Sequence, residues 1–359
     1  MIHGGNLVDI YPAAIALARE SRGWTQTDLA SATGVSQGKI CKYELGLLKT
    51  PESEIEVISK VLRYDRSFFD RAEQISGLGG DFLYRKKANL QAKVKRRVQA
   101  EANIRKIQVE RLLQSGQMQP VFPFPTIQPE DFDGPVYRIA TQVREAWRLP
   151  NGPVRNVTKI IEGAGGIVFK MNFESDLIDG TNLRLPGLPP LLFLNENVSG
   201  ERHRFNLAHE LAHTVMHFSV SLGDAEDQAN EFAREFLLPR TEVRSDLKNL
   251  DLVAATRLKS VWGVSMALLI VRAKELNQIS PATYRRLFTA LGAKGYRRTE
   301  PLPVAMEQPE TFDRLVSWHR ENLGFSTDDI RRLLFTDSLG SIPVTDPPPR
   351  MRLVGSLFG

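Results

Sequence analysis

The sequence predicts an α+β protein that is mostly helical, with a helical bundle at the N-terminus and a second domain in which helices pack on a small sheet. Two observations lead to this class. Paired helical patterns occur in residues 24–46 and again in residues 205–238. Short apolar runs, of which Leu191–Asn195 is one, indicate buried strands ahead of the second pair. At 359 residues, the chain has room for two or three domains.

The composition is typical of a globular protein, with 42% hydrophobic and 25% charged residues. No run of 18 apolar residues occurs, so we expect no transmembrane helix and no membrane partner. The first 20 residues lack a basic segment before an apolar run, so we expect no signal peptide. The single cysteine, Cys41, cannot form an internal disulfide, and a cytoplasmic location is expected.

Residues 24–46 predict two short helices joined by a tight turn. Thr25 or Thr27 can cap the start of the first helix, and Gly34 ends it. Ser36 caps the start of the second helix, and Gly46 ends it. Apolar residues at helical spacing in Pro12–Arg22 and Glu52–Leu62 predict flanking helices. The result is a bundle of about four or five helices with a helix-turn-helix at its centre.

This pattern resembles the lambda-repressor-like, Xre-type family of DNA-binding domains over about residues 10–70. The residues that carry the resemblance are Gln26, Leu29, Ala30, Gly34, Val35, Ser36, Ile40, Glu44 and Gly46. It implies that Ser36–Leu45 is a recognition helix in the major groove of DNA. The DNA-binding residues that it implies are Gln26, Ser36, Gln37, Lys39 and Lys42.

The implied contacts differ in kind. Gln26 falls where the first helix meets phosphate, whereas Gln37 can contact adenine and Lys42 can reach guanine. Gly38 departs from a typical reading position because it has no side chain. Residues 1–80 carry nine Lys/Arg and ten Asp/Glu. This near-neutral charge leaves open a helix-turn-helix that contacts only proteins.

The basic character of the chain is concentrated in residues 85–111, which carry ten Lys/Arg and two Asp/Glu. Apolar residues on a rough helical stripe predict one long helix here. Its charged side chains form either a solvent-exposed face or a surface that contacts the phosphates of DNA. A glycine-rich hinge at residues 75–81 precedes this helix, and the Pro-rich residues 117–135 that follow predict a second linker or a wrapping strand.

The motif in residues 209–213 has the spacing of a metal site. Residues four apart share one face of a helix, so His209 and His213 can offer two imidazoles to one ion. Glu210 is one step round the helix, where it can act as a general base toward a water molecule. This is the arrangement of zinc proteases. The alternative is a helix whose histidines are buried in the core.

A second amphipathic helix, ended by Pro239, offers the third ligand that zinc needs. Glu226 lies on the same face as two alanines that permit close helix packing, and Asn230 lies one turn further on. Asp224 is a competitor for the ligand position. His217 binds the metal, orients a metal ligand or lies on the surface, and we favour the orienting role for it and for Asn230.

These two helices, with the apolar stretches around them, resemble the ImmA/IrrE family of metallopeptidases over about residues 150–292. The resemblance implies a zincin-like, gluzincin-type core of helices and a small sheet that binds Zn2+. It implies His209, His213 and Glu226 as metal ligands and Glu210 as the catalytic base. It also implies an Xre-type repressor as the substrate, cleaved to switch on mobile-element or stress-response genes.

Other parts of the second domain are predicted less specifically. We expect Leu191–Asn195 to be an edge strand that can hold an extended peptide by main-chain pairing. His203, His217 and Arg202 are candidates for stabilising an oxyanion. Residues 250–295 predict helices on the peptidase core, and residues 309–335 predict a helix pair joined at Gly324 with a Ser cap. This C-terminal part is either a second binding module or a lid.

The predicted domains are a helix-turn-helix domain at 1–75, a basic helical connector with a Pro-rich linker at 76–135, a peptidase domain at 136–295 and a C-terminal extension at 296–359. Two functions remain open. One is a DNA-binding zinc endopeptidase. The other is a transcriptional regulator, antitoxin-like in one form, whose peptidase domain is a sensor or a self-processing element. A homodimer is also compatible with the Xre-type resemblance.

Overall fold

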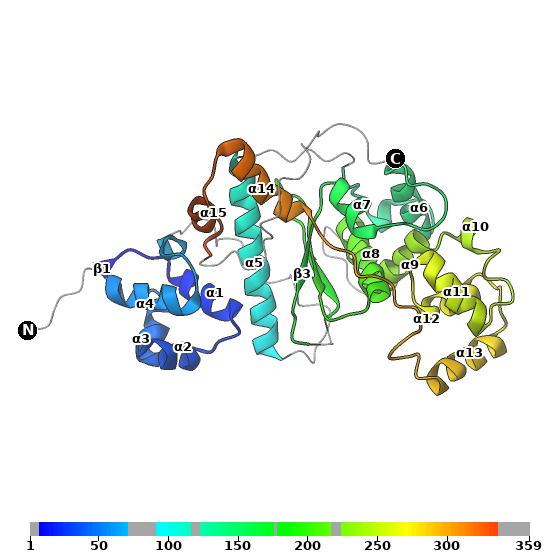
Figure 1. Cartoon of the computed structure of the whole chain (residues 1–359), viewed down its shortest axis with the longest axis horizontal. Coiled ribbons are helices and arrows are strands. Elements are labelled where there is room, and N and C mark those ends of the chain that lie inside the picture. The colour runs from blue at the N-terminus through cyan, green and yellow to red at the C-terminus, as the bar shows by residue number, and fades with distance from the viewer. Residues whose placement is uncertain (1–6, 71–90, 116–122, 176–177, 217–223, 337–359) are drawn as a thin grey trace, which may run out of the picture. The chain divides into compact units, whose positions relative to one another are not determined.

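A computed structural model describes residues 7–70, 91–115, 123–175, 178–216 and 224–336 (Figure 1). These residues form two compact units. Unit 1 contains residues 7–70, 91–115, 173–175 and 311–336, and unit 2 contains residues 123–172, 178–216 and 224–310. The predicted hinge at 75–81 and His217 lie outside the described residues. The predicted α+β class is confirmed, since helices predominate and the largest described sheet has three strands.

Unit 1 begins as a bundle of short helices around one apolar core. Its first elements are β1 (Leu7–Val8), α1 (Pro12–Ser21), α2 (Gln26–Thr33), α3 (Gln37–Glu44), β2 (Thr50–Pro51), α4 (Glu52–Leu62) and a 3-10 turn, η1 (Arg66–Asp70). β1 and β2 pair antiparallel. Ile15, Leu29, Ile40 and Ile58 are fully buried between the helices. Burial of such aliphatic side chains is the main stabilising contribution in a bundle of this size.

Local signals set the helix limits in the helix-turn-helix. Thr25 caps α2 in a capping box, because its Oγ1 accepts from the Asp28 N–H at 3.1 Å and the Asp28 carboxylate accepts from the Thr25 N–H at 2.8 Å. Gly34 ends α2 with φ of 74°, as predicted. The prediction for Ser36 is wrong in one respect. Ser36 occupies the N-cap position of α3, but its side chain makes no capping hydrogen bond.

The predicted long basic helix is α5 (Ala92–Ser115), and it packs along α1. Ile104 and Ile107 of α5 are buried in the same core as the helix-turn-helix residues. The predicted C-terminal helix pair is also present, as α14 (Thr311–Leu323) and α15 (Thr327–Leu334), and both helices pack on α5. Phe335, directly after α15, packs edge-on against Phe68 with 5.3 Å between ring centroids. The basic helix is therefore a structural member of unit 1.

Unit 2 is built on a sheet with strand order β3-β5-β4, formed by β3 (Ile167–Met171), β4 (Gly180–Leu183) and β5 (Leu191–Asn195). β5 pairs parallel with β3 and antiparallel with β4. The prediction that Leu191–Asn195 is an edge strand is wrong, because this strand lies in the centre and all five of its residues are buried. A continuous apolar run is typical of a strand covered on both faces. Its two neighbours, β3 and β4, are the edge strands of the sheet.

The helices of unit 2 share a single core. They are α6 (Tyr137–Ala146), α7 (Val157–Gly163), α8 (Gly200–Met216), α9 (Ala225–Leu237), α10 (Arg240–Val243), α11 (Leu252–Trp262), α12 (Met266–Glu275) and α13 (Pro281–Ala293), with a 3-10 turn, η2 (Pro129–Asp131). Of these, α7 and α8 pack on the sheet. The described part of the Pro-rich stretch wraps this unit, since the Ile127 N–H donates to the Val215 carbonyl at 3.0 Å. Among the described residues no single helix is long and apolar enough to cross a membrane. One pair of helices, α11 and α12, has the required length and composition when taken together, but the two helices are bent by 104°.

Two glutamates in the segment after α13 accept hydrogen bonds from the N-termini of α12 and α7. Glu300 accepts hydrogen bonds from the first N–H groups of α12, at Met266 (2.9 Å), and from Lys259 Nζ at 2.9 Å. Glu307 does the same for α7, accepting from Val157 N at 3.1 Å and Thr158 N at 2.8 Å. Carboxylates are favoured at helix N-termini, where unpaired N–H groups gather.

Replacing the Glu307 carboxylate should destabilise the protein. It also pairs with Arg204 of α8, and both side chains are less than 8% exposed. Glu307→Ala leaves the buried Arg204 cation without its counter-ion and two helix N–H groups without their acceptor, so we expect the free energy of unfolding to fall by about 3 kcal/mol. Glu310→Ala is the matched control, because Glu310 pairs with Lys159 at a half-exposed position and should cost less than about 1 kcal/mol. Urea unfolding of both variants measures the difference, and equal stabilities would contradict this role of Glu307.

Candidate metal centre and DNA-contacting residues

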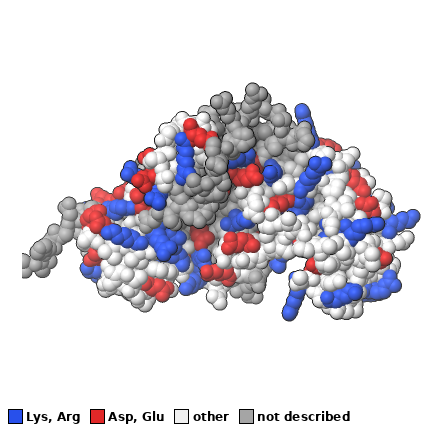
Figure 2. Space-filling model, in the orientation of Figure 1, with Lys and Arg blue, Asp and Glu red and all other residues white. Residues whose placement is uncertain are grey.

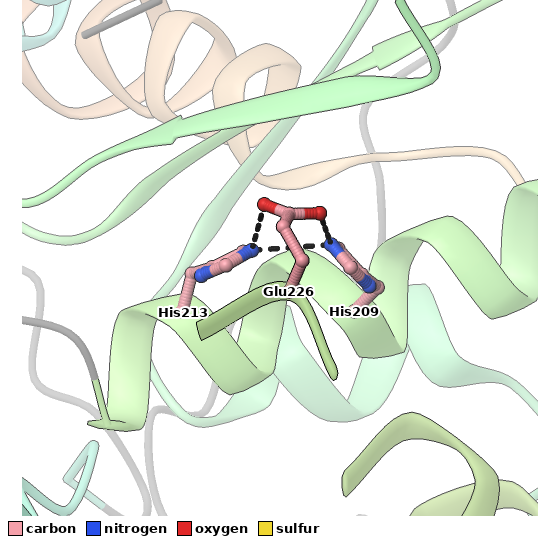
Figure 3. Close-up of side chains that lie close together, drawn as sticks. All are labelled: His209, His213 and Glu226. Atoms are coloured by element: carbon pink, nitrogen blue, oxygen red, sulfur yellow. Dashed lines mark hydrogen bonds and ion pairs between the residues drawn. The ribbon is translucent and has the colours of Figure 1, made fainter. Parts of the chain in front are cut away.

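Two histidines and one glutamate from two helices converge in unit 2 (Figure 3). His209 and His213 are one turn apart on α8, and their Nε2 atoms lie 3.1 Å from each other. Glu226, in the first turn of α9, places Oε2 3.4 Å from His209 Nε2 and Oε1 3.3 Å from His213 Nε2. One ligand atom from each residue lies within 4.8 Å of the others. The structure thus brings together the three residues that the sequence predicted as ligands.

The close approach of α8 and α9 makes this convergence possible. Ala229 and Ala233, on the face of α9 that carries Glu226, are fully buried. Methyl side chains at these positions let the helix backbones come near each other. Phe232 and Phe236 pack in the core beside them, with their rings stacked at 5.9 Å.

The donor set fits zinc, which takes imidazole nitrogen and carboxylate oxygen ligands in sites that keep one position open. Asn230 Oδ1 lies 3.1 Å from His209 Nδ1, so it can accept a hydrogen bond from that nitrogen. A proton held on Nδ1 leaves the Nε2 lone pair directed at Glu226 and His213. The histidine side chains are 11% and 13% exposed, whereas Glu226 is 48% exposed. The cluster therefore opens to solvent on the side of α9.

Glu210 lies on the face of α8 that packs against β4, and it is 2% exposed. Its Oε2 accepts a hydrogen bond from Asn182 Nδ2 of β4 at 2.8 Å. Gly180, two residues earlier on the same strand, leaves room for the Glu210 side chain, since a Cβ there would lie 3.0 Å from Glu210 Cγ and 2.8 Å from Leu194 Cδ2. β4 thus holds the Glu210 carboxylate in one orientation, and neither Gly180 nor Asn182 was singled out from the sequence.

The backbone of β4 also presents groups for pairing. The Asn195 N–H donates to the Asp179 carbonyl at 3.0 Å, so these two opposite residues form a hydrogen-bonded pair. Along an antiparallel ladder, hydrogen-bonded pairs alternate with pairs that are not hydrogen-bonded. Thr181 and Leu183 therefore face β5, while Gly180 and Asn182 direct their N–H and C=O groups to the other edge. No described strand pairs with that edge.

The structure describes two of the candidates for oxyanion stabilisation, His203 and Arg202. His203 is fully buried on the side of α8 that faces α7, with Nε2 3.5 Å from Thr158 Oγ1. Burial lowers the pKa of His203 to about 4, so the ring is neutral near pH 7. Arg202 pairs with Asp179, just before β4, at 2.6 Å. His203 is therefore not available to a substrate.

The predicted DNA-contacting residues in unit 1 fall into two groups. Gln37 Nε2 donates to Gln26 Oε1 at 2.7 Å, and Gln26 Nε2 donates to Glu44 at 2.8 Å, which joins α2 to α3. Ser36, Gln37 and Lys42 are exposed at or on α3. Lys39 is separate, because its Nζ pairs with Glu54 of α4 at 2.9 Å. The structure therefore brings Gln26 and Gln37 together and directs Lys39 away from them.

Each of the two units contains a segment that matches a known protein family. Residues 15–69 match the family described as helix-turn-helix, and residues 163–274 match the peptidase family described as IrrE N-terminal-like domain. The chain joins a DNA-binding helix-turn-helix domain to a domain of a peptidase family. The predicted fusion of these two domain types is confirmed. A comparison with curated proteins found no match.

Removing the Asn230 amide should weaken metal binding without unfolding the domain. Asn230→Ala removes the acceptor that orients His209, and loss of such a partner costs about 10- to 100-fold in metal affinity. Competition with a zinc chelator of known affinity measures this change. Asp227→Ala is the control, since it removes an exposed carboxylate from the same helix and should leave zinc affinity within about threefold. Equal affinities for the wild type and Asn230→Ala would show that Asn230 does not orient His209.

Proposed function

We propose that the protein is a zinc-dependent endopeptidase that cleaves an Xre-type transcriptional repressor and so derepresses mobile-element or stress-response genes. The observation that carries the proposal is the cluster of His209, His213 and Glu226 beside a buried glutamate, Glu210, at the open edge of β4. A protein that binds DNA through its helix-turn-helix domain would act in the cytoplasm, where the chromosome lies.

Zinc, held by His209, His213 and Glu226, would supply Lewis acidity that polarises a substrate carbonyl. Glu210 takes a proton from the attacking water and passes it to the leaving amine. The hydrogen bond from Asn182 Nδ2 keeps its carboxylate aligned for both transfers. Burial of Glu210 at 2% exposure limits its exchange with bulk water.

The substrate is an extended peptide that adds to the edge of β4. Gly180 and Asn182 offer two N–H and two C=O groups there, and main-chain pairing of this kind binds peptides without demanding one sequence. Side chains at alternate positions of the peptide then decide specificity. A segment that must become extended to bind is available in a repressor whose helices open locally.

The fused DNA-binding domain supports the choice of a repressor as the substrate. A helix-turn-helix that binds at or near the operator of a repressor would raise the local concentration of that repressor around the peptidase unit. The same fusion favours a second candidate function. The protein would then be a transcriptional regulator that cleaves itself, with its peptidase unit acting as the sensor.

Glu210→Gln tests the proposed chemistry. The substitution keeps the shape of the side chain and the three metal ligands but removes the base, so the variant should bind one zinc per chain and lose at least about 100-fold in cleavage rate. Metal analysis and a cleavage assay with purified Xre-type repressors encoded beside this protein measure both effects. A Glu210→Gln variant that cleaves at the wild-type rate would refute the proposed role of Glu210.

A mixing experiment separates the two functions. Wild-type protein incubated alone with zinc should stay intact, whereas a repressor added in trans should be cut, since the proposal assigns cleavage to a separate substrate. Glu210→Gln protein, offered as a substrate to the wild type, controls for cleavage between copies. Conversion of the wild type into fragments, with the repressor left intact, would favour the self-processing regulator.

A further inference from the structure

A cavity of about 390 Å3 lies in unit 1 between the helix-turn-helix and the start of α5. Its lining includes Arg19, Glu20, Gln26, Gln37, Lys93 and Arg96. Lys93 and Arg96 come from the first turns of α5, far along the chain from the other four. In Figure 2, Lys and Arg side chains gather where α1 and the start of α5 meet.

Gly23, in the turn between α1 and α2, permits this approach. A Cβ at Gly23 would lie 3.2 Å from Arg97 Cδ and 4.0 Å from Lys93 Cε, and the residue has φ of 69°. Glycine is favoured both by that left-handed backbone and by the side chains that pass over it. The first turn of α5 is therefore packed directly against the residues that precede α2.

The cations around the cavity differ in how fully they are neutralised. Arg19 makes two hydrogen bonds to Glu44, at 2.6 and 3.0 Å, and Arg97 pairs with Glu101 and Glu174. Arg96 is 58% exposed and forms a longer ion pair, at 3.7 Å, with Glu20, which it shares with Arg19.

Lys93 is also exposed, and within the described parts of the chain it has no ion pair. Lys93 and Arg96 thus give this cavity its available positive charge.

The position of the cavity relates these charges to DNA. Gln26 and Gln37, which line it, are the first residues of α2 and α3. DNA backbone phosphates flank the groove that a recognition helix enters, and contacts to them hold the protein in register. Residues 1–80 carry a net charge of −1, from nine Lys/Arg and ten Asp/Glu, so the helix-turn-helix alone offers little attraction to phosphate.

We propose that Lys93 and Arg96 bind a DNA backbone phosphate beside Gln26, which makes the start of α5 part of the DNA-binding surface. This proposal rests on DNA binding by the helix-turn-helix. Lys93 and Arg96 contact the backbone and not the bases, so they raise affinity for every sequence equally. Base preference stays with Gln37 and Lys42 of α3.

The test measures the affinity of full-length protein for duplex DNA as a function of NaCl concentration. The probes are a duplex selected from a random pool by the wild-type protein and a duplex of unrelated sequence. The variant Lys93→Gln/Arg96→Gln should bind both duplexes at least about tenfold more weakly, and the magnitude of the slope of log affinity against log salt should fall by about 1, the value for one lost phosphate contact. The ratio between the two duplexes should not change. Thermal unfolding confirms that the variant is folded.

Lys248→Gln/Lys294→Gln is the matched control, because it removes the same charge from exposed positions of unit 2 and should leave both affinity and slope as in the wild type. An unchanged salt slope in the Lys93/Arg96 variant would overturn the proposal while leaving DNA binding intact. A changed ratio between duplexes would also overturn it, because it would assign these residues to base reading. Wild-type protein that selects no duplex would overturn DNA binding itself and the proposal with it.

Discussion

The packing of α9 against α8 is the contact on which the proposed chemistry depends. His209 and His213 are placed by the geometry of a single helix, but two imidazoles do not make a zinc site. The third donor arrives only if α9 lies close enough for Glu226 to reach between them, and the buried alanines at 229 and 233 provide that proximity. Larger side chains at these two positions would push the helices apart and cost about 1–3 kcal/mol through overpacking.

α8 has a different partner on each of its remaining faces. Glu210 faces β4, and Arg204 binds the Glu307 carboxylate in the segment after α13. His209, Glu210 and His213 therefore share one rigid element, α8, with Arg204, which stabilises unit 2. A helix held on several sides moves little when a peptide adds to the edge of β4. This rigidity keeps the Glu210 carboxylate close to where it must act.

Much of this organisation is readable from the sequence, because it depends on local rules. Thr25 and Gly34 mark the ends of α2 by capping and by a left-handed backbone, and the four-residue spacing of His209 and His213 places both on one face of a helix. The tertiary arrangement of the strands is not local. The apolar run Leu191–Asn195 indicates a buried strand but does not reveal its neighbours, so its central place was missed. Asn182 carries no signal in its own segment, since its importance arises from contact with Glu210, 28 residues away.

In the proposed zinc site, α8 supplies two imidazoles and α9 one carboxylate. X-ray absorption spectroscopy of the zinc-loaded protein tests this ligand set most directly, because scattering from imidazole rings counts the histidine ligands and the first shell separates nitrogen and oxygen from sulfur. The account predicts one zinc per chain with two imidazoles, no sulfur and otherwise oxygen ligands, and loss of one oxygen ligand or of the metal in Glu226→Ala. A sulfur ligand from Cys41, three or more imidazoles, or a Glu226→Ala spectrum identical to that of the wild type would contradict it.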